Sequence, residues 1–143
     1  MLIRELLTEG DLTRAFPVVK ELRPLLTLGV LLSAFPVQRA EGYRLFAAEA
    51  GGEVTAVIGW RVQTYLHSGK TLYVDDLVTA TAHRGKGYAR ALLDHAEAAA
   101  REAGCRSFSL DSGHQRFDAH RVYLNSGLRI VSHHFAKDLE GTP

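Results

Sequence analysis

Hydrophobic and polar residues recur with two different periods along this chain, and the two periods separate helices from strands. A period near 3.6 residues indicates a helix with one buried face, whereas alternation or a short apolar run rich in β-branched and aromatic residues indicates a strand. The helical period predicts helices over Leu12–Leu22, Thr27–Phe35, Tyr88–Ala103 and Ala119–Ser126. The strand patterns predict strands over Leu2–Leu6, Tyr43–Ala50, Thr55–Leu66, Thr71–Thr79, Ser107–Leu110 and Leu128–Lys137.

Helix-start residues, prolines and glycines mark where these elements begin and end. Thr8–Asp11 supplies residues that favour the start of the first helix. Pro24 should end or bend that helix, and the second helix should end near Pro36, because proline lacks the N–H that a helix interior needs. Gly51-Gly52 and His67–Lys70 indicate short turns between strands, so the three strands from residue 43 to residue 79 should form an antiparallel meander.

The order of the elements predicts the fold class. Strand, two helices, three strands, helix, strand, helix and strand follow one another, which indicates an α+β fold around a mixed, mostly antiparallel sheet. No repeat, low-complexity segment or linker interrupts this order. We therefore expect a single domain over residues 1–143.

Composition narrows the class of protein. Hydrophobic residues make up 46% of the chain and charged residues 23%, which is typical of a soluble globular protein. The net charge of +1 argues against a dedicated nucleic-acid surface, and no apolar run is long enough to span a membrane. Acids in Met1–Asp11 argue against a signal peptide, and the single Cys105 cannot form an internal disulfide. We expect a soluble, cytoplasmic protein in which Cys105 is a packing residue.

The segment Thr81–Arg90, TAHRGKGYAR, combines two glycines with three cations between a predicted strand and a predicted helix. Glycine permits left-handed backbone, and the start of a helix offers N–H groups without helical partners. Together these features predict a site for an anion.

Two familiar glycine motifs do not fit this segment. A P-loop needs a hydroxyl residue after its lysine, but Lys86 is followed by Gly87 and Tyr88. A dinucleotide fingerprint needs a third small residue, where this chain has Arg90, and it opens a parallel unit, whereas the preceding strands are predicted to be antiparallel.

The same segment resembles the acyl-CoA signature of the GNAT N-acetyltransferase superfamily. Arg84–Ala89 matches the pattern Arg/Gln-x-x-Gly-x-Gly/Ala, and Ala119–Leu128 is similar to the family's Ala-x-x-x-Tyr-x-x-x-Gly-Phe block, with Leu128 in place of phenylalanine. The resemblance extends from the first strand to the last and is strongest to small-molecule amine acetyltransferases, aminoalkylphosphonate acetyltransferases among them. It implies the GNAT fold, with helices on both faces of the sheet.

The resemblance also implies a co-substrate and its binding residues. Acetyl-CoA would give its acetyl group directly to the primary amine of a small molecule. The CoA diphosphate would be held by Arg84, Gly85, Lys86, Gly87, Tyr88, Ala89 and Arg90. The backbone of Leu77, Val78 and Thr79 would lie along the pantetheine arm, beside a bulge that separates the fourth strand from the fifth, and Ser112 would add a polar contact.

Three residues are the catalytic candidates. By resemblance, Tyr123 would protonate the departing thiolate, and Asp75 would accept the proton of the amine, often through water. Asp76 occupies a position where related enzymes also carry an acid, so either aspartate could hold the amine. Because side chains alternate along a strand, the two aspartates should face opposite sides of the sheet.

Several alternatives stay open from the sequence. Seven histidines do not make a metal site, because His133 and His134 are adjacent and His114 and His120 are six residues apart, so no metal is expected. Leu25–Phe35 could be an acceptor lid, core or a dimer face. A protein or peptide amine could replace the small-molecule acceptor, or the chain could be a non-catalytic acyl-CoA sensor. Homodimers are common in the family, and no nucleic-acid or membrane partner is expected.

Overall fold

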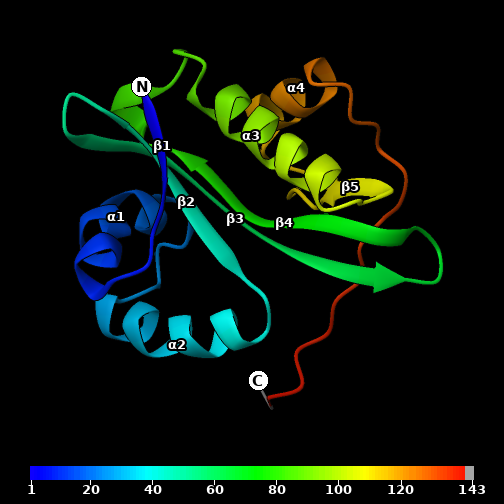
Figure 1. The fold of residues 1–143 in the computed structure, drawn as a ribbon, viewed down its shortest axis with the longest axis horizontal. Coiled ribbons are helices and arrows are strands. Elements are labelled where there is room, and N and C mark those ends of the chain that lie inside the picture. Colours follow the sequence, from blue (N-terminus) through cyan, green and yellow to red (C-terminus); the bar gives the residue numbers. More distant parts are fainter. Residues whose placement is uncertain (141–143) are drawn as a thin grey trace. The chain divides into compact units, whose positions relative to one another are not determined.

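Five strands form one mixed sheet in the computed structural model, which describes residues 1–140 (Figure 1). The strands are β1 (Leu2–Glu5), β2 (Arg44–Ala50), β3 (Glu53–Tyr65), β4 (Gly69–Thr79) and β5 (Ser107–Leu110). Neighbours from β1 to β4 pair antiparallel, whereas β4 and β5 pair parallel. The predicted α+β class with a mostly antiparallel mixed sheet is confirmed. Residues 141–143, the end of the predicted domain, lie outside the described residues.

The described chain divides into two compact units, Met1–Leu110 and a second unit that begins at Asp111. The first unit contains the sheet with α1 (Glu9–Leu22), α2 (Leu28–Ala40), a short 3-10 helix η1 (Thr81–His83) and α3 (Tyr88–Glu102), and the second contains α4 (Phe117–Asn125). No helix among the described residues is both long and apolar enough to cross a bilayer.

Threonine hydroxyls begin the first two helices. The Thr8 hydroxyl accepts the backbone N–H of Asp11, and the Asp11 carboxylate accepts the backbone N–H of Thr8, which forms a reciprocal cap for α1. The Thr27 hydroxyl caps α2 by accepting the N–H of Val30. The helix start predicted at Thr8–Asp11 is confirmed.

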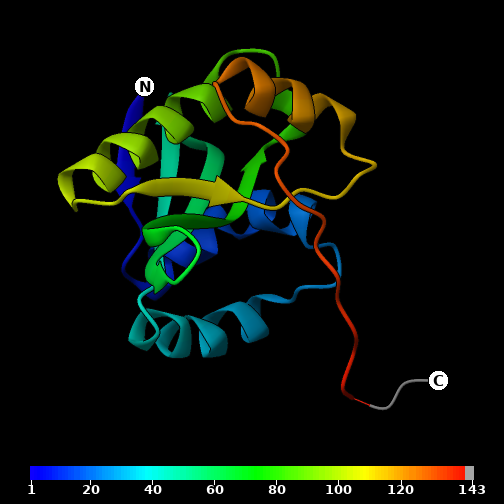
Figure 2. The same cartoon turned by 90° about the vertical axis from the view of Figure 1, so that its right-hand side faces the viewer.

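Helices cover both faces of the sheet in the first unit, as Figure 2 shows. Leu45 and Ala47 of β2 are buried in a core with side chains of α1 and α2. The intervening Phe46 lies on the other face, where its ring stacks on Trp60 with centroids 4.4 Å apart and His95 of α3 lies beside both. Alternation along β2 thus supplies two cores, one on each side of the sheet.

The predicted end of the second helix near Pro36 is wrong, because α2 continues to Ala40. Proline removes one helical hydrogen bond, but contacts beyond it hold the last turn. Arg39 donates to the Glu5 carboxylate of β1 at 3.1 Å, and the backbone N–H of Tyr43 donates to the carbonyl of Gln38 at 2.9 Å. These bonds offset the one that Pro36 cannot make.

The predicted final strand over Leu128–Lys137 is also wrong. The second unit has no strand among its described residues, and Ile130, Val131 and Phe135 are exposed. A strand gains its backbone hydrogen bonds from a neighbouring strand, so an apolar pattern without such a neighbour does not produce one.

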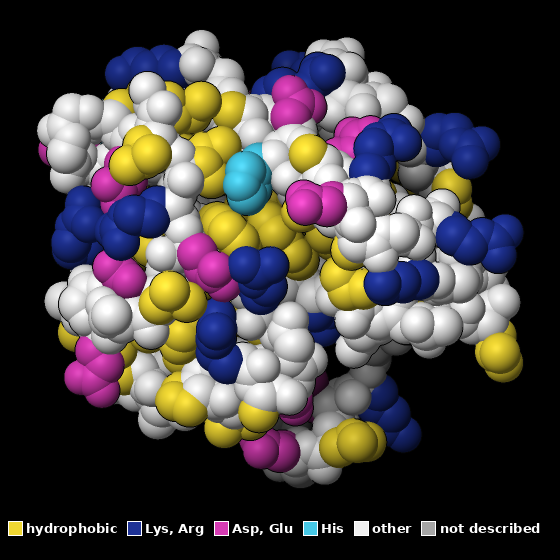
Figure 3. All heavy atoms as spheres, viewed as in Figure 1, with side chains coloured by type: hydrophobic (Ala, Val, Ile, Leu, Met, Phe, Trp, Pro, Cys, Tyr) yellow, Lys and Arg dark blue, Asp and Glu magenta, His cyan; other side chains and the backbone are white. Residues whose placement is uncertain are grey.

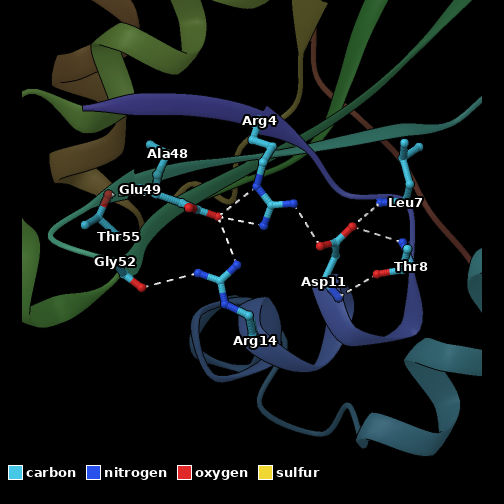
Figure 4. A network of polar contacts seen from close by, with 9 residues as sticks. All are labelled: Arg4, Leu7, Thr8, Asp11, Arg14, Ala48, Glu49, Gly52 and Thr55. Carbon is cyan, nitrogen blue, oxygen red and sulfur yellow. Dashed lines mark hydrogen bonds and ion pairs between the residues drawn. The ribbon is translucent and has the colours of Figure 1, made fainter.

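A network of charged side chains holds the start of α1 against the sheet (Figure 4). Arg4 of β1 donates to Asp11 of α1 and to Glu49 of β2, both at 2.9 Å, and Arg14 of α1 donates to the same Glu49 carboxylate at 3.3 Å. Backbone N–H groups, first that of Leu7, and Arg4 hold the pKa of Asp11 well below its ordinary value. These bonds fix the start of α1. They therefore also define the position of the other end of this helix, which contacts the candidate functional site.

Candidate functional site

Strand β4 carries one extra residue where it passes β3. Gly59 pairs with Asp76 and the next residue, Trp60, pairs with Val74, so Asp75 has no partner across the ladder. This β-bulge interrupts the alternation of side chains. The prediction that Asp75 and Asp76 face opposite sides is wrong, because their contacts place both carboxylates in one group of side chains.

That group, which we call the acid cluster, consists of Arg23, Tyr43, Arg61, Asp75 and Asp76. One oxygen of the Asp76 carboxylate accepts from Nη2 of Arg23 at 2.7 Å and from its Nε at 3.1 Å. The other accepts from the Tyr43 hydroxyl at 2.7 Å. Arg23 also donates to the backbone carbonyl of Asp75 at 3.3 Å. The carboxylate of Asp76 is therefore held on both of its oxygens.

Asp75 has a different environment within the acid cluster. Its carboxylate accepts from Nη2 and Nε of Arg61 at 2.8 and 3.1 Å, and the Arg61 guanidinium lies 5.4 Å from the centroid of the Tyr43 ring. Burial raises the pKa of the Asp75 carboxyl above its ordinary value, and the neighbouring charge of Asp76 acts in the same direction, although Arg61 opposes both. Asp75 therefore binds a proton more readily than an exposed aspartate does.

Gly59 makes room for the hydroxyl of Tyr43. A Cβ at position 59 would overlap the oxygen of that hydroxyl, so the bond from Tyr43 to Asp76 depends on the missing side chain. The Tyr43 side chain is buried, and burial together with the Asp76 charge raises the pKa of its phenol well above the ordinary value. Tyr43 is therefore a neutral hydrogen-bond donor.

A pocket of about 620 Å³ lies between α1, α2 and the face of the sheet that carries Asp76. Its apolar lining includes Val19, Leu22, Leu26, Val30, Leu31 and Val78. Its polar lining residues are Arg23, Gln38, Tyr43 and Asp76. Side-chain hydrogen bonds join Arg23 and Tyr43 to Asp76, whereas the bond from Tyr43 to Gln38 is between backbone groups. This α1–α2 pocket thus combines a polar end with an apolar body.

The edge of β4 that follows the bulge is not covered by β5. The two strands pair from Thr71 to Val74, and no described strand pairs with the following residues on that side. Leu77 and Thr79 are partly exposed there, whereas the Val78 side chain is buried in the core with α1. The bulge of β4 lies at Asp75, in its pairing with β3, two residues before the segment where the sequence predicted one. The backbone of Leu77–Thr79 lies on this edge of the sheet.

The glycine loop, Arg84–Arg90, leads from η1 into α3. Gly85 and Gly87 have φ values of 75° and 88°, which residues with side chains rarely adopt. Gly87 is the N-cap of α3, and no side chain of residues 1–140 caps this helix, whose first backbone bond runs from the N–H of Ala91 to the carbonyl of Gly87. The N–H groups of Tyr88 and Ala89 precede this first bond, so they have no acceptor within the helix.

Cations surround this helix start, and α1 fixes the segment before it. Arg84 and Lys86 are exposed, although the Arg84 side chain also donates to the carbonyl of Thr79 at 3.3 Å. The Glu21 carboxylate of α1 accepts the backbone N–H of Thr81 at 2.9 Å and also accepts from the Thr81 hydroxyl, which lowers the pKa of Glu21. The geometry suits an anion at the mouth of α3.

Two predicted residues belong to the second unit. Tyr123 lies in α4, where partial burial raises the pKa of its phenol, so the hydroxyl keeps its proton at neutral pH. The Ser112 hydroxyl is buried and has no hydrogen-bond partner in the part of the chain that the structure describes. No group of three or more His, Cys, Asp or Glu residues suited to a metal ion occurs among residues 1–140.

Sequence reasoning missed Arg23, Tyr43, Gly59 and Arg61. One signal was present, because a glycine inside an apolar strand often marks a bulge or a close approach of another group. The partners of the two aspartates had no such signal, since Arg23 lies 53 residues before Asp76 and Tyr43 lies 33 residues before it.

Comparison with known proteins identifies the family. The model of the acetyltransferase (GNAT) family matches residues 11–128. The chain belongs to the GNAT acetyltransferase family. The family prediction made from Arg84–Ala89 and Ala119–Leu128 is thereby confirmed, and the protein is an acetyltransferase enzyme.

Relatives within the GNAT family include N-acetyltransferases. An uncharacterized N-acetyltransferase of Bacillus subtilis, YhdJ, is 37% identical over 138 residues, which cover 94% of this chain and 96% of that protein. The aminoalkylphosphonate N-acetyltransferase of Salmonella typhimurium is 36% identical over 98 residues, which cover 68% of this chain and 62% of that protein.

Solved structures show the same fold. The aminoglycoside N-acetyltransferase AAC(6')-Iy, solved in complex with CoA, superposes with a TM-score of 0.84 at 16% identity, and the match covers 98% of this chain and 95% of that one. At this identity the likeness extends to the GNAT fold alone. The predicted GNAT fold is thus confirmed.

Proposed function

We propose that this GNAT enzyme uses acetyl-CoA and transfers the acetyl group directly to the primary amine of a small molecule. The observation that carries the proposal is the glycine loop. It combines left-handed glycines, an uncapped start of α3 and exposed cations in a chain that belongs to the GNAT family. Helix starts of this kind bind phosphate groups.

The diphosphate of CoA would be bound mainly by backbone N–H groups of the glycine loop. Arg84, Lys86 and Arg90 supply positive charge around it, while Gly85 and Gly87 let the phosphates approach the backbone. The remaining residues of the proposed binding segment are Tyr88 and Ala89, which contribute N–H groups at the first turn of α3.

The uncovered edge of β4 would hold the pantetheine arm. Backbone groups of Leu77, Val78 and Thr79 would bind the arm as an added strand binds, and Ser112 of the second unit would add a polar contact. A backbone N–H near the bulge would stabilise the negative charge that develops on the thioester oxygen during attack.

Asp75 is the proposed base and Asp76 a positioning acid. Both oxygens of Asp76 already accept hydrogen bonds, from Arg23 and Tyr43, which hold this carboxylate in place at the end of the pocket. The raised pKa of Asp75 brings its proton affinity closer to that needed at neutral pH. The amine would lose its proton to Asp75, directly or through water, as the new C–N bond forms.

Tyr123 is the proposed acid. As the C–S bond breaks, the CoA thiolate would take the phenolic proton, so the proton lost by the amine and the proton gained by the thiol balance. A phenol with a raised pKa is protonated at neutral pH and can supply this proton.

The α1–α2 pocket is the proposed acceptor site. Its volume of about 620 Å³ lies in the usual range for small-molecule pockets, and it adjoins Asp76, one residue from the proposed base. A pocket of this size supports a small acceptor over a folded protein.

Calorimetry and a thiol-release assay test the proposal. We expect acetyl-CoA to bind the pure protein and CoA thiol to appear when an amine panel is added. Tyr123→Phe should lower kcat by about 10²–10⁴-fold while the Kd for acetyl-CoA stays within about twofold, because the variant removes a proton donor and not a binding group.

Two outcomes would contradict the proposal. Absence of acetyl-CoA binding would exclude the function as stated. Binding without thiol release for any small amine, including the alkylamines used below, would favour a peptide acceptor or an acyl-CoA sensor, and a peptide library would then separate these two.

A further inference from the structure

The α1–α2 pocket has one polar end and an otherwise apolar wall, and we infer that its acceptor is a primary amine on an apolar body, an alkylamine or arylalkylamine. The inference rests on the proposed function and specifies its substrate class. It is carried by the lining of the pocket and by the way Asp76 is held.

The body of the pocket offers hydrophobic contact and few polar partners. Side chains from α1, α2 and the sheet form it, among them Leu22, Leu26, Val30, Leu31, Leu45 and Val57. A hydroxyl or phosphate placed against such side chains would lose its bonds to water without replacement, which disfavours sugars and phosphorylated amines. An alkyl chain or a ring would instead gain from leaving water.

Helix α2 provides a second sign that this region accepts apolar groups. Its sequence, LGVLLSAFPVQRA, is apolar on almost every side, yet Leu31 and Phe35 are its buried residues. Val30 lines the pocket and is still 54% exposed. Hydrophobic side chains also reach the surface over α2 in the lower left of Figure 3. The apolar wall is therefore open to an incoming ligand.

The polar end suits the amine. Asp76 is the one acid among the described residues that line the pocket, and each of its oxygens retains capacity beyond the bonds from Arg23 and Tyr43. An arriving ammonium or amine N–H can use that capacity. A single acid matches a single amine, whereas a polyamine would leave its other charges against apolar side chains.

The same bonds disfavour an anionic acceptor. Arg23 is the cation among the described lining residues, and two of its nitrogens already donate to Asp76 at 2.7 and 3.1 Å. A phosphonate or carboxylate would have to compete with that aspartate for the guanidinium while lying close to a second negative charge. The prediction thus differs from the phosphonate acceptor in the name of the Salmonella relative.

A series of linear alkylamines tests the inference. With acetyl-CoA saturating, kcat/KM measured by thiol release should rise about threefold to fourfold for each methylene from propylamine to hexylamine, because each added methylene leaves water. These amines have nearly equal basicity, so the proton step stays constant across the series. Phenethylamine should also be a good acceptor. Aminomethylphosphonate, spermidine and kanamycin should be at least tenfold poorer than hexylamine. A flat series, or a higher kcat/KM for any of the three polar amines, would overturn the inference.

A pair of variants on one helix locates the effect. Val30→Phe should fill part of the pocket and lower kcat/KM for hexylamine by about tenfold, with less than a twofold change for propylamine. Val37→Phe is the matched control, because Val37 lies on the same helix, is 59% exposed and is not in the pocket lining. Equal effects of the two substitutions, or an equal loss for both amines, would place the acceptor elsewhere.

Direct binding keeps this inference separate from the proposed function. Hexylamine titrated into the full-length protein with CoA present should bind with a negative heat-capacity change that Val30→Phe diminishes. Binding of acetyl-CoA without binding of hexylamine would refute the substrate class and leave the proposed function standing. Binding of hexylamine without binding of acetyl-CoA would refute the proposed function, and the pocket would then be a binding site for apolar amines and not an acceptor site.

Discussion

At Gly59 the backbone of β3 lies against the hydroxyl of Tyr43, and that contact allows the bond from Tyr43 to Asp76. The bulge places Asp75 beside it, where Arg61 is its principal partner. Two consecutive aspartates therefore have different hydrogen-bond partners. The difference arises from single residues and not from the type of side chain.

Gly59→Ala should separate Tyr43 from Asp76. The added methyl overlaps the buried hydroxyl, so we expect a loss of about 1–3 kcal/mol in the free energy of unfolding, measured by urea denaturation, and lower acetyl-transfer activity. Gly29→Ala is the control, because a methyl there meets no described atom within 4 Å and alanine is a better helix former than glycine in the first turn of α2. Equal stability of the two variants would show that the close approach at Gly59 is unimportant.

Asp75 should define the acidic limb of the pH profile. A base must be deprotonated, so kcat/KM should rise with pH through the pKa of Asp75, and burial moves this limb to higher pH than an exposed aspartate would give. Asp75→Asn should remove the limb and lower kcat/KM by about 10²–10⁴-fold. Asp76→Asn should keep the limb while changing KM for the amine. A limb that persists in Asp75→Asn would assign the base elsewhere.

At the scale of elements, the two ends of α3 carry glycines with nearly the same backbone but different surroundings. Gly87 has a φ of 88° at the start of the helix, and Gly104 has a φ of 76° after its end. A methyl at either position meets open space, so alanine would carry the same conformational cost of about 1–2 kcal/mol. The two positions differ in that Gly87 belongs to the glycine loop.

Because Gly87 and Gly104 have similar backbone conformations, substituting each one by alanine gives a controlled test of the glycine loop. Gly87→Ala should raise the Kd for acetyl-CoA by about tenfold, because it displaces the N–H groups that would bind the diphosphate. Gly104→Ala should lower the free energy of unfolding by about as much as Gly87→Ala does, and it should leave the Kd for acetyl-CoA unchanged. Calorimetric titration measures the Kd of each variant, and urea denaturation measures its free energy of unfolding. An equal change in Kd for the two variants would argue that the glycine loop does not contact CoA.

At the scale of the whole molecule, local pattern predicted most of the fold. Periodicity placed all five strands of the sheet and the helices near their observed bounds, since α1, α2, α3 and the strands β2, β3 and β4 each bury one or both faces in a core. It failed at Pro36, where Arg39 and Tyr43 hold the turn beyond the proline, and at Leu128–Lys137, where no described strand pairs with the segment. The ion pair of Arg39 with Glu5 and the absence of a described partner strand for Leu128–Lys137 both concern parts of the chain that are distant in the sequence.

The site was predicted less completely for the same reason. The glycine loop is one continuous segment, so its residues could be named from the sequence. The acid cluster joins Arg23, Tyr43 and Arg61 to the two aspartates across the sheet, and the bulge that unites them depends on the register between β3 and β4. The local pattern of hydrophobic and polar residues specifies neither the register between these strands nor the contacts of side chains that are far apart in the sequence.

The end of α1 contacts residues beside both proposed substrate sites, and this has a consequence for how the two substrates would bind. Glu21 holds Thr81 at the start of η1, which leads into the glycine loop, and Arg23, two residues after Glu21, holds Asp76 at the polar end of the α1–α2 pocket. A shift of this end of the helix would be transmitted to both places at once. Thermodynamic reciprocity then requires that, if one substrate tightens binding of the other, the second tightens binding of the first by the same factor.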